Sequence, residues 1–478
     1  MLLKQKTNQI EQTADTATAE RTIPSIEPTT KSGKLRFSSF IASIIILPVL
    51  GFTLPSAVFD LVRMGGQECS KPDLITGFMH LPNKKIVWKQ EGYSEDATNS
   101  QGFLDNEHKI AKDANIFRIA MLGDSQTESL QVPQQLRFSN QLAARLNEEY
   151  VKRGKETKIE VLNCGISAAG TGQELLTYLR YVKQYKPDVT VLFYDSGDED
   201  KNQRKPVMAQ WYPHVVFGLD SKGQLIVSWR DFDSWLHSAQ AMPIALFETL
   251  RRDSRMWGVA IQEFTGIKTN PFFIAGCTYL DRWHLLTPIE DALTATFPVS
   301  KFGPQDFQQS PEKIGQERAS FALTYGLHMV DRSNATPIKF DKKEYEFGQG
   351  AEYHTLHLTQ EQQAQLEQRY HERWQVTLAI LKRLSEECKK DGGTLVVVGF
   401  PPQLLKDGFQ QTFTQITDLA TQEGFLAENF TAPFDMLVNA KHCEPRYVTH
   451  LTPAGHEVMT ELLVDYLKRK DLLPVKSN

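Results

Sequence analysis

Four short apolar runs along the chain predict the strands of a buried parallel sheet. The runs are Phe117–Leu122, Ile159–Asn163, Val189–Tyr194 and Thr394–Phe400. Each is apolar almost throughout rather than alternating, as expected for a strand that is covered on both faces. Segments with helical periodicity lie between or after them. Strand–helix alternation of this kind predicts α/β layers joined by right-handed crossovers.

The helical segments are recognised by the spacing of their apolar residues and by their termini. Thr359–Lys390 predicts one long helix. The last helix is expected to begin with Thr452 as its N-cap and Pro453 in its first helical position. Two further helices are indicated by apolar residues that share one face, namely Phe138, Leu142 and Leu146, and Leu175, Leu179 and Val182.

The stretch 205–353 interrupts this alternation. It contains five of the seven tryptophans and only short segments of mixed pattern. A structureless loop of that length is uncommon in a compact domain. We therefore interpret residues 205–353 as an insertion, folded over one end of the sheet, that separates the two parts of the α/β domain, 115–204 and 354–478.

The N-terminal part has a different character. Residues 1–36 are polar and lack periodicity, which predicts a disordered tail. Residues 37–59 form an uncharged run that is long enough to span a bilayer as a helix. Lys31, Lys34 and Arg36 precede the run, whereas Arg63 alone follows it closely. This bias predicts a cytoplasmic N-terminus and an extracytoplasmic main domain, in the periplasm or at the cell surface.

Other readings of the run fit less well. A cleaved signal peptide has a short basic region, and this tail is long for one. A buried core helix of this length would normally carry a charge. Residues 60–114 are expected to form a linker and a lead-in to the α/β domain.

Composition excludes several classes of function. The formal net charge is −5, and no basic block is long enough to indicate a nucleic-acid partner. The five cysteines include no Cys-x-x-Cys pair, which argues against a zinc ribbon or a disulfide scaffold and leaves a single disulfide open. His354 and His357, near Glu352, have a loose spacing for a metal site. We predict no metal and no organic cofactor.

Candidate chemistry follows the predicted strands, because ligands of open α/β sheets bind beyond the carboxyl ends of the strands. Gly123-Asp124-Ser125 follows the first strand and opens a helix, so Ser125 is expected at a helix N-terminus that favours a developing anion. A Gly-rich loop beginning at Gly165 follows the second strand and lacks the ending of a P-loop. The backbone N–H of Gly165 is expected to face the same site.

The order of these segments resembles the SGNH (GDSL-type) hydrolase superfamily. Gly197-Asp198-Glu199 follows the third strand, and His450 stands just before the final helix. Lead-in residues Tyr93–Glu107, with Asn99-Ser100-Gln101-Gly102-Phe103 among them, resemble those of bacterial membrane-anchored members, as do Gln173–Leu176 and Lys186–Asp188. The resemblance covers 93–202 and 374–472 and leaves out the Trp-rich insertion. It implies a three-layer αβα sandwich with a parallel sheet, also called flavodoxin-like.

The resemblance also implies roles for particular residues. Ser125 would be the nucleophile and His450 the general base that takes its proton. The oxyanion hole would consist of the Ser125 and Gly165 N–H groups and the residue at position 198. Gly123, Asp124 and Gly197 would be supporting residues of the turns.

Two positions depart from the family pattern. An Asn normally donates to the oxyanion where this chain has Asp198, and an ionised carboxylate has no hydrogen to donate. The family also places an Asp two or three residues before the histidine, where this chain has Tyr447 and Val448. The sequence therefore predicts a Ser–His dyad without an acid.

Two functions remain in view. The first is a membrane-anchored ester hydrolase or O-acyltransferase that acts on acyl esters of an extracytoplasmic glycan or lipid. The second is a catalytically silent SGNH-like module that binds glycan or scaffolds an envelope assembly. Asp198 and the missing acid favour the second, and the retained Ser125, Gly165 and His450 favour the first. Substrate and oligomeric state stay open.

Overall fold

In the computed structural model, five parallel strands form the central sheet in the order β12-β11-β7-β5-β6. The strands are β5 (Ile116–Leu122), β6 (Lys158–Asn163), β7 (Val189–Tyr194), β11 (Thr394–Gly399) and β12 (Leu426–Asn429). The chain enters at β5, adds β6 on one side and then reverses to add β7, β11 and β12 on the other. This reversal creates a switch point between β5 and β7, where ligands of doubly wound sheets bind.

The structure describes residues 70–88, 91–195, 197–203, 215–229, 232, 310–330, 360–401 and 406–474. All of them fall in the compact unit Pro55–Asn478. Within these ranges no helix is long and apolar enough to cross a membrane, and the predicted span 37–59 lies outside them. His354 and His357 also lie outside the described residues.

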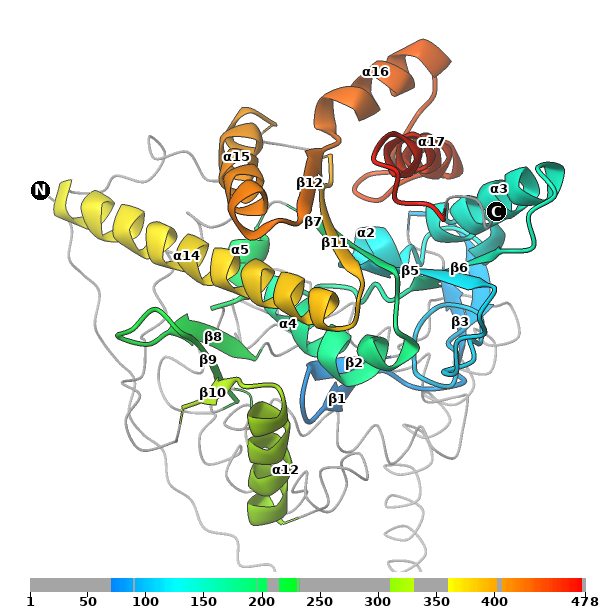
Figure 1. The fold of residues 1–478 in the computed structure, drawn as a ribbon. Helices are drawn as coiled ribbons and strands as arrows, with labels where there is room; N and C mark the ends of the chain where they lie inside the picture. The colour runs from blue at the N-terminus through cyan, green and yellow to red at the C-terminus, as the bar shows by residue number, and fades with distance from the viewer. Residues whose placement is uncertain are drawn as a thin grey trace, which may run out of the picture. The chain divides into compact units, whose positions relative to one another are not determined.

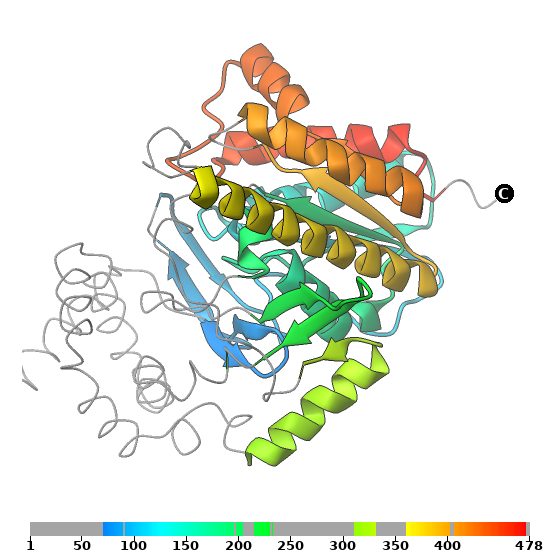
Figure 2. The ribbon, with the colours of Figure 1, turned by 90° about the vertical axis from the view of Figure 1, so that its left-hand side faces the viewer.

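Helices cover both faces of the sheet (Figures 1 and 2). One face carries α3 (Phe138–Lys152), α16 (Thr431–Lys441) and α17 (Pro453–Arg469), and the other carries α4 (Thr171–Thr177), α14 (Gln360–Lys390) and α15 (Lys406–Glu423). After α4 the chain continues through a π-helical turn, Tyr178–Val182, and a 3-10 turn, Lys183–Tyr185. The predicted α/β class with a parallel sheet is thereby confirmed.

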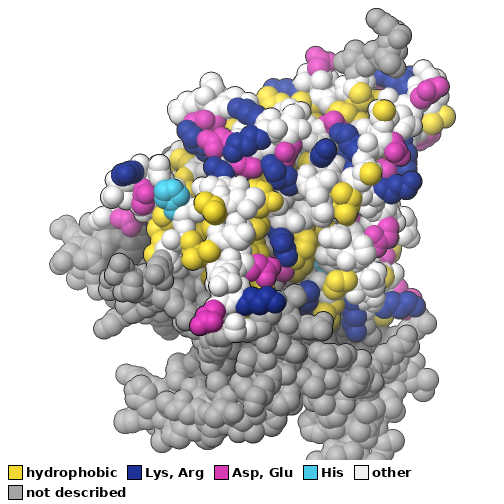
Figure 3. Space-filling view, turned by 60° about the horizontal axis from the view of Figure 1, so that its bottom comes forward, with side chains coloured by type: hydrophobic (Ala, Val, Ile, Leu, Met, Phe, Trp, Pro, Cys, Tyr) yellow, Lys and Arg dark blue, Asp and Glu magenta, His cyan; other side chains and the backbone are white. Residues whose placement is uncertain are grey.

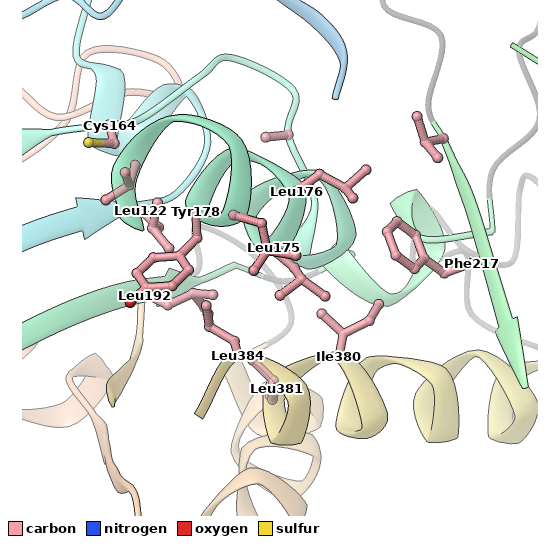
Figure 4. Close-up of a cluster of buried hydrophobic side chains, with 14 of the residues drawn as sticks. Leu122, Cys164, Leu175, Leu176, Tyr178, Leu192, Phe217, Ile380, Leu381 and Leu384 are labelled. Carbon is pink, nitrogen blue, oxygen red and sulfur yellow. The ribbon is translucent and has the colours of Figure 1, made fainter. Parts of the chain in front are cut away.

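Alternate residues of each strand enter two separate cores, because successive side chains of a strand point to opposite faces. On β5, Ile119 and Met121 pack toward α3 and α17, whereas Ala120 and Leu122 pack toward α4 and α14. Figure 4 shows Leu122 and Leu192 of the sheet facing Leu175 of α4 and Leu381 of α14. Burial on both faces explains why the strands read as continuous apolar runs.

The lead-in forms two antiparallel hairpins beside the sheet. They are β1 (Ser70–Asp73) with β2 (Gly77–His80), and β3 (Lys85–Trp88) with β4 (Ser94–Ala97). The buried Arg137 ties the second hairpin to the sheet domain. Its guanidinium pairs with Asp96 and donates to the carbonyl groups of Leu104 and Ser129. The lead-in is thus a packed part of the domain.

The described part of the insertion contains a three-stranded sheet and a helix. These are β8 (Val216–Leu219), β9 (Leu225–Ser228), β10 (His328–Met329) and α12 (Pro311–Thr324). Trp229 is buried and donates to the carbonyl of Ile75 at 2.8 Å. Phe217 packs in the core beside α4 and α14. The described strands therefore pack against the helical layer of α4 and α14 and against the lead-in.

The surface carries charges of both signs. On the face in Figure 3, Lys and Arg side chains lie interspersed with Asp and Glu over the described elements.

Candidate active site

Ser125 occupies a sharp turn at the carboxyl end of β5. Gly123 leads from the strand to α2 (Ser125–Glu128), and a Cβ at Gly123 would lie 2.1 Å from the Thr127 hydroxyl oxygen. Asp124 is the N-cap, since its Oδ1 accepts the Gln126 N–H at 3.0 Å. Close packing at Gly123 and the hydrogen bond of Asp124 therefore set the position of Ser125. Ser125 stands first in the helix, as the sequence predicts.

His450 lies in the loop that precedes α17 and reaches Ser125 across the edge of the sheet. Its Nε2 atom is 2.9 Å from Ser125 Oγ. Thr452 caps α17 by accepting the Gly455 N–H at 3.2 Å, as predicted. The cap and the Tyr447 N–H bond to the His450 carbonyl, 2.9 Å, hold the loop in place. A hydroxyl and an imidazole at this distance form the pair that nucleophilic catalysis requires.

A carboxylate that the sequence does not indicate completes the series. Glu91 Oε2 lies 2.6 Å from His450 Nδ1, and it also accepts the His450 backbone N–H at 3.1 Å. Glu91 Oε1 accepts the Thr449 N–H at 3.1 Å. The expectation of a dyad without an acid is therefore incomplete. The acid comes from the lead-in, 359 residues away along the chain, instead of from the segment before the histidine.

The environment of Glu91 favours its ionised form. Partial burial works in the opposite direction, but the hydrogen bonds and the electrostatic attraction from His450 outweigh it and hold the pKa of Glu91 below its ordinary value. The carboxylate is therefore charged at neutral pH. An ionised partner at Nδ1 keeps the proton on that nitrogen and leaves Nε2 free to accept the Ser125 proton.

Close packing fixes the backbone that carries Glu91. Glu91 has φ +59°, an uncommon conformation for a residue other than glycine. A Cβ at the next residue, Gly92, would lie 2.3 Å from the Gln131 carbonyl oxygen and 2.9 Å from the Tyr447 ring. Glycine is required there because the segment passes so close to the loop after α2. Ser94 anchors the same segment through its hydroxyl, which donates to Leu130 O at 2.6 Å.

Gly165 lies in close packing, and its N–H is hydrogen-bonded within its own loop. Its N–H donates to the Asn163 side-chain oxygen at 3.1 Å. A Cβ at this position would lie 2.3 Å from the Glu128 nitrogen. Gly165 thus lets the loop that follows β6 approach α2. The N–H of Gly165 already has Asn163 as its partner. Glu128 secures the same loop by accepting the Ser167 N–H at 2.9 Å.

Asp198 is buried and bound on both carboxylate oxygens. It begins α5 (Asp198–Lys201) directly after Gly197, whose φ of +96° favours glycine. Oδ2 accepts the Asp195 N–H at 3.1 Å, and Oδ1 accepts from Lys201 Nζ at 2.9 Å. Burial raises the pKa of Asp198 to about 6 although Lys201 opposes the shift. Among the described hydrogen bonds, none joins Asp198 directly to Ser125 or His450.

Comparison with known proteins gives structural neighbours but no family assignment. No protein-family model and no curated protein matches the chain. The structure is similar to that of TesA, with a TM-score of 0.31 and 11% identity over 74% of this chain and 99% of that one. It is similar also to a catalytic mutant of Axe2, an acetylxylan esterase from Geobacillus stearothermophilus, with a TM-score of 0.31 and 11% identity over 76% and 97%. Because the TM-scores and identities are this low, any activity must be argued from the residues of the chain itself.

Proposed function

We propose that this chain is a serine ester hydrolase or O-acyltransferase that works through an acyl-Ser125 intermediate. The observation that carries the proposal is the unbroken series Glu91–His450–Ser125, with contacts of 2.6 Å and 2.9 Å. The series stands at the carboxyl edge of the sheet, beside the switch point between β5 and β7. A hydroxyl, an imidazole and a carboxylate in this order activate the hydroxyl for acyl transfer.

The mechanism follows from these contacts. Ser125 Oγ attacks the ester carbonyl carbon while His450 Nε2 takes the hydroxyl proton. Glu91 stabilises the imidazolium that forms and keeps its orientation. The tetrahedral adduct then breaks its bond to the alkoxy oxygen, which leaves as an alcohol with the proton from His450. Water or a substrate hydroxyl next attacks the acyl carbon and gives its proton to His450. The bond between the acyl carbon and Ser125 Oγ then breaks, His450 returns the proton to Oγ, and the acyl group leaves as an acid or as a new ester.

The oxyanion of the adduct needs backbone donors, and two are suited to the task. Ser125 stands at the first position of α2, where an N–H has no partner within the helix. Ala168, with φ +64°, follows Ser167 in the loop that Glu128 holds against α2. Within the described residues, neither N–H has a hydrogen-bond partner. We therefore assign the donors to Ser125 and Ala168 in place of Gly165.

The proposed substrate is an acyl ester of an extracytoplasmic glycan or lipid. Tyr93 and Tyr447, which are 49% and 38% exposed, belong to the two segments that meet at Glu91. Exposed aromatic rings in these segments suit the apolar face of a sugar or an acyl chain. The uncharged run 37–59 supports placement at a membrane.

One observation favours a silent glycan-binding module instead. Asp198 carries a buried carboxylate where the related enzymes have an amide donor, and a negative charge near the site would oppose the oxyanion. The two functions differ in whether Ser125 reacts with an electrophile.

A fluorophosphonate probe applied to the detergent-solubilised full chain tests the proposal. The wild type should become covalently labelled, because the Glu91–His450 pair activates Ser125. Ser125→Ala and His450→Ala should abolish labelling. The matched controls Ser320→Ala and His442→Asn change exposed residues outside the site and should label like the wild type. Absence of labelling in the wild type would favour the silent module.

The orientation of the chain is tested separately. Because the basic residues precede the run 37–59, alkaline phosphatase fused after Leu104 should be exported and active. A cytoplasmic reporter at the same position should be inactive. The opposite pattern of the two reporters would overturn the proposed location.

A further inference from the structure

Lys201, on α5, contacts the three segments that follow β5, β6 and β7. Its Nζ atom lies 3.1 Å from Asp124 Oδ2, 3.0 Å from the Ala169 carbonyl oxygen and 2.9 Å from Asp198 Oδ1. Asp124 directly precedes the nucleophile, Ala169 follows Ala168, and Asp198 begins the third segment. An ammonium has three hydrogens to donate, so these acceptors use its full capacity.

The surroundings of Lys201 contain an excess of carboxylates. Burial works against the charge, yet Asp198, Asp124 and Asp195 raise the pKa of Lys201 well above its usual range. The side chain of Lys201 is only 16% exposed, and that of Asp198 is 1% exposed. Glu174 is also close, and burial with Asp198 beside it raises its pKa well above the ordinary value, which favours a neutral acid. The Lys201 ammonium therefore offsets part of the negative charge of these carboxylates.

The chain makes room for this side chain. A Cβ at Gly170 would lie 2.5 Å from Lys201 Cβ and 3.3 Å from the Asp198 carbonyl oxygen. A separation of 2.5 Å between two carbon atoms is far shorter than contact distance. Gly170 thus permits the aliphatic part of Lys201 to run beneath the loop that follows β6. Replacing Gly170 with a larger residue would displace this part of Lys201 without removing a charge.

We propose that Lys201 is a positioning residue of the site, which fixes the Ser125 turn and the adjoining loops and compensates the carboxylate of Asp198. Asp124 connects the two parts of the proposal, because one of its oxygens caps α2 and the other binds Lys201. The pair formed by Asp198 and Lys201 takes the place of the neutral amide expected at position 198. The expected effect of Lys201 on kcat rests on the proposed function, whereas its expected effect on the order of the loops does not.

Kinetics of ester hydrolysis by the full chain test the first consequence. Lys201→Met should lower kcat by about 10²-fold, the effect of misplacing reacting groups by an ångström, and should change KM by less than about threefold. Adding Asp198→Asn to Lys201→Met should restore kcat by about tenfold or more, because an amide needs no counter-charge and donates hydrogen bonds. A purely structural lysine would show additive losses in the double variant.

Lys183→Met is the matched control. Lys183 also binds two carboxylates, Glu387 at 2.9 Å and Asp391 at 2.8 Å, and is 22% exposed. It stands before β7, at the amino edge of the sheet, so its loss should reduce stability and leave kcat within about threefold. An unchanged kcat in Lys201→Met, or no recovery in the double variant, would overturn the proposal.

Hydrogen–deuterium exchange tests the second consequence without any activity. Lys201→Met should increase exchange in residues 123–128 and 165–170, and Lys183→Met should not. Where Lys201→Met fails to fold, Gly170→Ala replaces it, with the same increase expected because the Lys201 stem is displaced. Unchanged exchange in these segments would refute the positioning role. A wild type that hydrolyses no ester but shows the increase in the variant would refute only the proposed function.

Discussion

Ser125→Ala, His450→Ala and the double variant should all lower kcat for ester hydrolysis by a similar factor, of about 10⁶. The reason is that Ser125 Oγ and His450 Nε2, 2.9 Å apart, act as one unit. Removal of either atom ends proton transfer and acylation together, so the second removal costs little more. KM should change much less than kcat, because neither group is expected to bind the substrate strongly before it reacts.

The measurement is steady-state hydrolysis of an activated acyl ester. The value of kcat is calculated from the concentration of folded protein. Ser320→Ala and His442→Asn, both at exposed positions, should retain wild-type kcat. Independent losses that multiply in the double variant would contradict a coupled pair. They would indicate that Ser125 and His450 support different steps.

Glu91→Gln should lower kcat by about 10⁴, as removal of the acid from such a triad does. Glutamine keeps the size of the side chain but has no charge to stabilise the imidazolium at Nδ1, where Glu91 Oε2 now lies at 2.6 Å. Its amide hydrogens could also stabilise the wrong histidine tautomer. Glu95→Gln is the matched control, because Glu95 is exposed on β4 four residues later. A Glu91→Gln variant as active as the wild type would remove Glu91 from the mechanism.

The pH dependence of Glu91 has a definite sign. The pKa of Glu91 is depressed in the folded state, so its stabilising contribution is complete above the ordinary carboxyl pKa and is lost as the pH falls through the depressed one. Its contribution to activity should therefore be constant from neutral pH to weakly acidic pH. Measurement of kcat against pH for the wild type and Glu91→Gln should show a nearly constant ratio over that range.

Local patterns were sufficient to predict the central sheet. The strand β7 has the predicted bounds, Val189–Tyr194, and β5, β6 and β11 differ from prediction by one residue at an end. These strands are covered on both faces, so nearly all of their residues are apolar and the strands can be recognised from composition. By contrast, β12 was not predicted, because its four residues, Leu426–Asn429, are all only partly buried and include Glu428.

The lead-in hairpins were also missed, and with them the acid. Residues 60–114 were interpreted as a linker and lead-in, although β3 and β4 pair there and Arg137 holds them to the domain. Short polar strands such as Ser94–Ala97 have no strong apolar alternation. Their stability comes from contacts with distant residues, which periodicity does not record.

Local sequence features were enough to place Ser125 after a strand and His450 before a helix, because a glycine turn, a helix cap and a strand end depend on neighbouring residues. The sequence also determined that position 198 carries a carboxylate and that no acid precedes the histidine at the usual spacing. Other contacts became known from the folded chain alone: Glu91 reaches the His450 ring, the Gly165 N–H binds Asn163, and Lys201 binds Asp124 and Asp198 together. These contacts join residues far apart in the chain or depend on the side-chain directions of a folded loop. Sequence spacing alone does not predict them, because they form only when the lead-in and the three loops pack on the sheet.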